Sequence, residues 1–340
     1  MTVAPPELPP AGVPTPAGGS APARRRSIVS GRLLAHIARR LLELVIVLLG
    51  VTFLIYAMVF ALRGDPIASL AGDRPLPANV IATLRARYHL DDPLWQQYLH
   101  YLGGLLQGDL GTDFTGRPVS EKMASRWPIT IVLALTAWGI QLVIGCVLGL
   151  IAGLRHGRTV DRAILFGTIV ISSIPIFVMA IAAQFFLGLK WGWLPIAGTT
   201  AGWPVAFILP AACLAVFELA AVSRLMRGGV VDSLQSDYVR TLRAKGLSSR
   251  RIVGIHVLRN AGIPVVTYAA INLGFLLGGA IIVEGIFNMP GIGGLMFTAI
   301  RNHEGPTVVS VATTLILIFL LLGALVDVIN SLLDPRIRRD

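Results

Sequence analysis

The feature that most constrains this chain is a series of six long apolar runs. They cover roughly residues 41–62, 129–153, 163–189, 205–224, 264–286 and 307–330. Each has the length of about 20 residues that a helix needs to cross about 30 Å of hydrocarbon. Only 14% of the residues are charged, whereas soluble domains have about 25%. We therefore predict an all-α integral membrane protein with about six transmembrane helices.

The N-terminal region poses a choice between a signal peptide and a membrane span. Residues 1–37 are predicted to be a disordered Pro- and Ala-rich tail that ends in a basic segment beside the membrane. The apolar run that follows exceeds the about 7 to 15 residues of a signal-peptide core, and no small-residue cleavage site is well placed. Residues 38–62 are therefore expected to form the first transmembrane helix.

The distribution of basic residues predicts the orientation. With the N-terminus inside, the inner segments carry 20 of the 29 Lys and Arg residues, so both termini are expected in the cytoplasm. Seven of the remaining nine lie in the long loop 63–128, where seven acidic residues accompany them. The net charge of +11 is thus explained by membrane topology, and no nucleic-acid partner is expected.

The long outer loop, residues 63–128, is predicted to contain amphipathic helices. Residues 77–90 show helical spacing of apolar side chains. A second helix is expected to start with Asp92 as the N-cap and Pro93 at the first helical position. Its apolar face would lie on the outer surface or cap the bundle. Residues 129–330 would then form a five-helix core, and 331–340 a cytoplasmic tail.

Prolines and glycines indicate how the helices bend and pack. Pro175 and Pro210 lie inside the third and fourth runs and predict kinks. Glycines repeat every four residues in the second and fifth runs, which suggests close helix contacts within the subunit or with a partner, although chance in a chain of 36 glycines is the alternative. These glycines are Gly145, Gly149, Gly153, Gly274 and Gly278.

The cytoplasmic loop 228–263, between the fourth and fifth spans, is expected to form two short helices joined by a hinge. Gly246 suits the left-handed position after a helix, and Ser248 suits the N-cap of the next one. Arg250 and Arg251 then fall in a first helical turn, where positive charge opposes the helix dipole. Binding to anionic lipid or to a partner surface would explain that misfit. Pro264 is expected to open the fifth span.

The same loop resembles that of the dipeptide/oligopeptide/nickel family of binding-protein-dependent ABC importer permeases, most closely the first, B-type, dipeptide permease. Residues 237–247 read Asp-Tyr-Val-Arg-Thr-Leu-Arg-Ala-Lys-Gly-Leu, and residues 259–264 read Arg-Asn-Ala-Gly-Ile-Pro. Leu242 stands where the family commonly has Ala. Shorter matching motifs occur in the same order along the chain, at Gly64-Asp65-Pro66, Leu90-Asp91 with Pro93, Gly108-Asp109-Leu110-Gly111, Val283-Glu284-Gly285-Ile286-Phe287, Pro290-Gly291-Ile292-Gly293 and Asp334-Pro335-Arg336.

The resemblance implies that this loop carries a coupling helix that docks on an ATPase. From the residues alone, a basic loop bound to lipid headgroups is the alternative. The implied coupling residues are Asp237, Tyr238, Val239, Arg240, Thr241, Leu242, Arg243, Ala244, Lys245, Gly246 and Leu247. The implied partners are a second homologous permease, two cytoplasmic ATPases that bind ATP and Mg²⁺, an extracytoplasmic substrate-binding protein and the lipid bilayer. The chain would then be a multi-pass protein of the bacterial inner membrane that imports short peptides.

The chain itself shows no enzymatic motif. A Walker A sequence needs Gly-Lys, and the three lysines follow Glu121, Leu189 and Ala244. No Cys or His spacing indicates a metal site, and Cys146 and Cys213 lie in apolar runs, so neither a cofactor nor a disulfide is expected. The branch also contains carriers of nickel and of glutathione-like or haem-like cargo, but no His or Met cluster in the spans favours nickel.

A few polar residues inside the spans are candidates for the translocation path. Such groups are costly in a membrane and usually face a cavity or a partner. The candidates are Glu218, Gln184 and Asn272. Pairing with an arginine such as Arg224 is the alternative for Glu218, and interfacial anchoring is expected for Glu284 and Asp327. A stand-alone secondary transporter or channel is the alternative function, but it would want more ionisable residues in the spans and no docking loop.

Overall fold

The computed structural model describes residues 25–60 and 77–333, and these residues form helices and no strand. The expected disordered tail, residues 1–24, and the last residues, 334–340, lie outside the described part, whereas residues 25–37 belong to a helix. The chain divides into two units, residues 1–47 and 48–340. The first unit contributes the beginning of α1, and everything below concerns the second.

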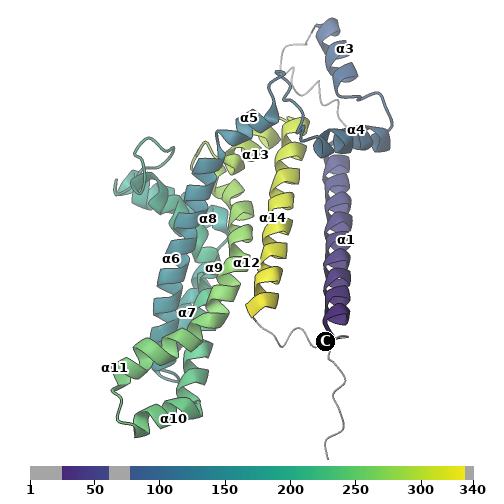
Figure 1. The fold of residues 1–340 in the computed structure, drawn as a ribbon. Coiled ribbons are helices and arrows are strands. Elements are labelled where there is room, and N and C mark those ends of the chain that lie inside the picture. Colours follow the sequence, from purple (N-terminus) through teal and green to yellow (C-terminus); the bar gives the residue numbers. More distant parts are fainter. Residues whose placement is uncertain (1–24, 61–76, 334–340) are drawn as a thin grey trace, which may run out of the picture. The chain divides into compact units, whose positions relative to one another are not determined.

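The helices match the apolar runs, with differences at their ends (Figure 1). The long ones are α1 (Arg25–Phe60), α6 (Trp127–Leu154), α9 (Val205–Gln235), α12 (Leu258–Ile286) and α14 (Gly305–Leu333). The shorter ones are α3 (Ala78–Arg87), α4 (Leu94–Leu106), α5 (Val119–Ala124), α7 (Thr159–Ser172), α8 (Ile176–Ala183), α10 (Asp237–Ala244), α11 (Ser249–Arg251) and α13 (Ile292–Arg301). Two π-helical segments, η1 (Gln184–Lys190) and η2 (Ile252–Val257), continue α8 and α11.

Five stretches of helix in the described residues are long and apolar enough to cross a membrane, or six if one bent pair counts as a single span. That pair is α7 with α8 and η1, which meet at 93°. Pro175 is the N-cap of α8, immediately after the break. The third run is therefore not one straight span: the proline does not kink a continuous helix but separates two. Pro210, by contrast, stays inside α9.

The core of the second unit lies where α6, α9 and α12 pack together. Its largest cluster of buried side chains includes Leu133 of α6, Leu214 of α9 and Val283 of α12. α7 is held to α9 by charge, since the Arg227 Nε lies 2.6 Å from the Asp161 Oδ1. Such pairing offsets the cost of placing the Asp161 carboxylate, which is 2% exposed, among packed helices.

Helix α4 begins one residue later than the sequence suggests, with Pro93 rather than Asp92 at the N-cap. Tyr98 of α4 is buried, and its hydroxyl lies 2.9 Å from the Thr52 hydroxyl of α1. The expected apolar face is only partly used, since Trp95 and Leu106 are exposed. The contact arises because the polar tips of Tyr98 and Thr52 satisfy each other while the ring packs against α1.

The segment between α4 and α5 is organised around the Asp113 carboxylate, which is fully buried. It pairs with Lys122 and accepts hydrogen bonds from the backbone N–H groups of Thr115 and Arg117, both at 2.8 Å. Burial alone would raise the pKa of Asp113, but the hydrogen bonds from Lys122, Thr115 and Arg117 outweigh it and lower that pKa to about 2. Lys122 also lies 3.7 Å from Glu304, just before α14.

Candidate functional site

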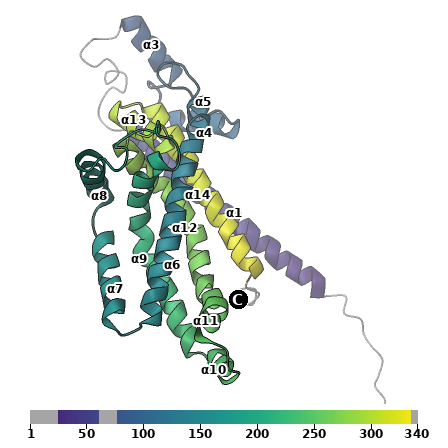
Figure 2. The same cartoon turned by 90° about the vertical axis from the view of Figure 1, so that its left-hand side faces the viewer.

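Helix α10 (Asp237–Ala244) lies at one end of the bundle, opposite α5 and α13 (Figures 1 and 2). Val239 is fully buried in a cluster that also contains Val230 of α9 and Val257 of η2. Leu242 and Leu247 pack partly against the same cluster. The other predicted coupling residues are exposed, which leaves a polar face available to a partner: Asp237, Tyr238, Arg240, Thr241, Arg243, Ala244, Lys245 and Gly246.

The start of α10 is tied to its neighbours by hydroxyl groups. Ser236 is the N-cap residue and its Oγ donates to the Ser233 carbonyl oxygen at 2.5 Å. Burial tends to raise the pKa of Tyr238, but hydrogen bonds with Ser233, Asn260 and Ser236 outweigh it, so that pKa is lowered. Asn260 belongs to α12, so Tyr238 links the short helix to a long one. The start of α10 is therefore tied directly to α12.

The predicted hinge after α10 is present. Gly246 has a φ of +79°, and Ser248 stands at the N-cap of the next helix. The second short helix is not separate, however, because α11 runs through η2 into α12. The expectation that Pro264 opens the fifth span is wrong, since Pro264 lies inside α12. Packing of η2 and α12 against α9 extends the helix well before the proline, and α9 itself continues to Gln235.

A cavity of about 720 Å³ lies between α9 and α12 on one side and α13 and α14 on the other. Most of its lining is apolar, including Phe217, Phe275 and Phe319. Two of the predicted path residues, Glu218 and Asn272, contribute polar groups to it. Glu218 accepts a short hydrogen bond from the Tyr268 hydroxyl of α12 and has no ion pair with Arg224 among the described salt bridges. A mostly apolar space with few polar groups is typical of a binding site for small molecules.

The two amide candidates have different surroundings. Asn272 is 2% exposed, and its Oδ1 accepts a hydrogen bond from the Gln141 Nε2 of α6 at 2.5 Å. Gln184 lies in η1, away from the residues that line the cavity. Its Nε2 donates to the carbonyl oxygens of Ile196 at 2.6 Å and Ile286 at 3.0 Å. The structure therefore brings Glu218 and Asn272 to one cavity and leaves Gln184 in a contact between a loop and a helix end.

The expectation that Glu284 anchors at the interface is wrong, because its side chain is fully buried. It accepts hydrogen bonds from the Thr130 hydroxyl at 2.7 Å and the Gly294 N–H at 2.8 Å. Thr130 Oγ1 in turn accepts from the Ile292 N–H at 2.8 Å. The carboxylate thus satisfies the first N–H groups of α13 and joins α13 to α6 and α12. The Asp327 side chain lies outside the described residues.

The glycines of α6 face α9 at close range. A methyl group added at Gly145 would lie 2.6 Å from the Val222 Cγ1, and one at Gly149 would lie 2.5 Å from the Ser223 carbonyl oxygen. At Gly153 the nearest atoms belong to Val230, at 2.8 Å. In α12, Gly274 faces Phe319 at 3.0 Å, whereas Gly278 has nothing within 4 Å. Within residues 25–60 and 77–333 nothing packs closely on Gly278, and a contact with a partner stays a prediction.

This architecture, with apolar spanning helices, a mostly apolar cavity that holds a few polar groups and a short exposed helix at one end, defines a membrane transport protein. Two family models match the chain: residues 33–134 match the N-terminal part of the membrane component of binding-protein-dependent transport systems, and residues 145–339 match the inner membrane component itself. The chain belongs to this family and is an inner-membrane permease subunit of an ABC importer.

Curated relatives agree with that assignment. The chain is 34% identical over 310 residues to a probable peptide ABC transporter permease protein, y4tP, of Sinorhizobium fredii, covering 89% of this chain and 99% of the relative. It is 37% identical over 309 residues to the glutathione transport system permease protein GsiC of Escherichia coli K12, covering 90% and 99%. These relatives extend over nearly the whole length that the sequence motifs cover.

Solved structures share the fold at low sequence identity. An inward-facing MetNI methionine ABC transporter matches with a TM-score of 0.50 and 17% identity, over 60% of this chain and 93% of that one. An amino acid ABC transporter crystallised with histidines matches with a TM-score of 0.50 and 14% identity, over 62% and 94%. The common fold covers nearly all of those shorter chains, so the remaining part of this chain is additional to it.

Proposed function

We propose that this permease imports short peptides and that α10 couples it to a cytoplasmic ATPase. The observation that carries the proposal is the arrangement of α10, with Val239 anchored among side chains of α9 and η2 and a polar face exposed around it. A helix held in this way transmits a displacement instead of absorbing it. In this proposal both termini are cytoplasmic, as the basic residues suggest.

The translocation path would pass along the cavity beside α9 and α12. Glu218 and Asn272 supply its polar groups, and the exposed aromatic rings of Phe217 and Phe275 supply apolar surface. A second homologous permease would cover this face and complete the path. The Gln184 side chain is held by the Ile196 carbonyl oxygen, so in this proposal Gln184 contributes to the path when the loop around Ile196 opens during transport.

The substrate class rests on the relatives. One is named a probable peptide permease and another a glutathione permease, and glutathione is itself a tripeptide. Short peptides are therefore the shared chemistry. An extracytoplasmic binding protein would deliver them, and two ATPase subunits holding ATP and Mg²⁺ would drive alternating access by moving α10.

The experiment that tests the coupling reverses one charge on α10. Arg243 is exposed on that helix, so Arg243→Glu is expected to reduce co-purification of the ATPase subunits without unfolding the chain. Arg301→Glu is the matched control, because Arg301 is also an exposed arginine in the last turn of a short helix but lies at the other end of the bundle. Unchanged ATPase binding by Arg243→Glu, or uptake in proteoliposomes without any ATPase, would contradict the proposal.

A further inference from the structure

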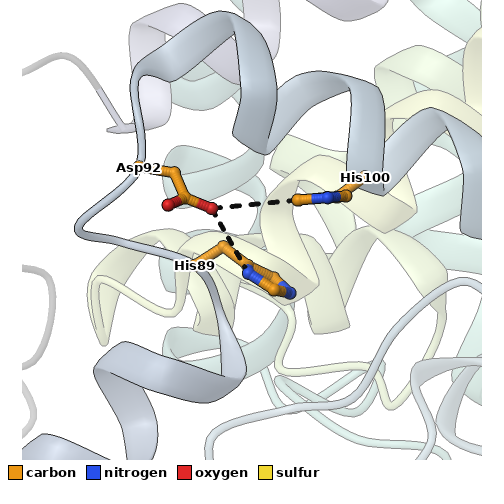
Figure 3. Close-up of side chains that lie close together, drawn as sticks. All are labelled: His89, Asp92 and His100. Atoms are coloured by element: carbon orange, nitrogen blue, oxygen red, sulfur yellow. Dashed lines mark ion pairs between the residues drawn. The ribbon is translucent and has the colours of Figure 1, made fainter.

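Three side chains that can bind a metal ion converge between α3 and α4 (Figure 3). His89 follows α3, Asp92 precedes α4 and His100 lies within α4. The Asp92 Oδ2 lies 3.4 Å from the His89 Nδ1 and 4.0 Å from the His100 Nδ1. One potential ligand atom from each residue lies within 4.8 Å of the others. The sequence offers no familiar metal-binding spacing here, and only the fold brings the three together.

The backbone around these residues holds the arrangement in place. His89 has a left-handed φ of 52°, and the Asp92 N–H donates to the His89 carbonyl oxygen at 3.0 Å, which closes a turn. The Gln97 Nε2 donates to the Asp92 carbonyl oxygen at 2.8 Å, and Gln97 is buried against α1. The turn is thus fixed by contacts that use none of the three potential ligand atoms. Those atoms stay available, because each side chain is at least 39% exposed.

The donor set selects a class of ion. Two imidazole nitrogens and one carboxylate oxygen suit zinc and similar transition metals, whereas Mg²⁺ and Ca²⁺ prefer oxygen ligands. Tetrahedral ligands at about 2.0–2.1 Å from zinc lie about 3.4 Å apart. The His89 to Asp92 distance already has this value. Rotation of the exposed His100 ring is enough to close the other gap, and a fourth position stays open.

We propose that His89, Asp92 and His100 bind a zinc-class divalent ion on the segment between α3 and α4. The bound ion links the turn after α3 to α4, and α4 in turn packs on α1 through Tyr98. It therefore restrains the segment from His89 to α4, none of whose residues lines the Glu218 cavity or belongs to α10. The proposal does not depend on the peptide substrate or on ATPase coupling.

The test measures zinc binding by the full chain in lipid nanodiscs, purified with a tag that contains no histidine. Competition against a chromophoric zinc chelator is expected to show about one strong site per chain, and Co²⁺ is expected to give the visible absorption of a tetrahedral site. His100→Ala should weaken zinc binding at least about tenfold. Asp92→Asn should also weaken it, since the amide keeps the shape but loses the charge.

His303→Ala is the control, because His303 is exposed and has a similar φ of 53° but lies outside the trio. It should leave zinc affinity unchanged. If His100→Ala does not fold, His100→Gln provides a second polar variant that lacks the imidazole. The proposal is overturned if the wild-type chain does not compete with the chelator, if the trio variants bind as well as His303→Ala, or if Mg²⁺ displaces zinc at equal concentration.

Discussion

Two glycine-spaced helix faces in this protein have the same pattern in sequence and opposite surroundings in the structure. Gly145, Gly149 and Gly153 of α6 bring that helix against the backbone of α9. In α12, Gly278 faces open space beside the cavity that Glu218 and Asn272 line. Small residues permit a close approach but do not require one. The first face fixes two helices together, and the second leaves open space beside the cavity at Gly278.

The largest effect is expected where an added methyl group meets backbone. Gly149→Ala should lower the free energy of unfolding by about 3 kcal/mol, because the new Cβ would lie 2.5 Å from the Ser223 carbonyl oxygen and α9 would have to move. Unfolding of the purified chain in mixed micelles would measure it.

Gly139→Ala in the same helix is the matched control, since nothing lies within 4 Å of that position. It should be neutral or stabilising by up to about 1 kcal/mol, because alanine is the better helix former. Equal destabilisation by both variants would mean that the α6–α9 contact is not what makes Gly149 necessary.

The next largest effect on stability is expected at the ion pair and hydrogen bonds of the buried Asp113 carboxylate. Asp113→Asn should cost about 2 kcal/mol near neutral pH, since the buried carboxylate accepts several hydrogen bonds and pairs with Lys122. Because the pKa of Asp113 is lowered from 3.8 to about 2, its contribution is fully present above about pH 4 and is lost as the pH falls toward about 2. Thermal unfolding of both proteins from neutral pH down to that range would show the difference shrink, and a constant difference would contradict this account.

At the cavity beside Gly278, removal of the Glu218 charge should affect transport more than stability. Glu218→Gln in the assembled importer is expected to lower peptide uptake by about tenfold, or about 1.4 kcal/mol, because it removes the carboxylate that faces the cavity and accepts from Tyr268. Glu121→Gln, at an exposed position of α5, is the control. Unchanged uptake and an unchanged substrate range would remove Glu218 from the path.

The smallest effect is expected at the open glycine. Gly278→Ala should change the free energy of unfolding by less than about 1 kcal/mol, because the added methyl group would have no neighbour within 4 Å among the residues that the structure describes. Gly274→Ala should destabilise the chain more, since it would approach Phe319 at 3.0 Å. The same unfolding measurement distinguishes the two. If Gly278→Ala blocks assembly with the second permease while the chain itself stays stable, the open face is a subunit contact.

Several features could be predicted from the sequence because they depend on local chemistry or on bilayer thickness. The apolar runs place the long helices, and the positive φ of Gly246 with Ser248 at the next N-cap follows from residue type. The match to residues 237–247 located α10. The helix ends were less predictable, because α9 and α12 are extended by packing against each other beyond the apolar limits.

The sequence by itself determined that this chain spans a membrane as helices and belongs with importer permeases, since length, hydropathy and the α10 motif are all properties of contiguous residues. Only the tertiary structure decided which polar groups work together. Glu284 accepts a hydrogen bond from the N–H of Gly294 in α13, ten residues further along the chain, and Gln141 donates one to Asn272, which is 131 residues away. His89 and His100 come close together because of the turn between α3 and α4. These contacts depend on the distance between side chains in space, and that distance is set by how the helices pack.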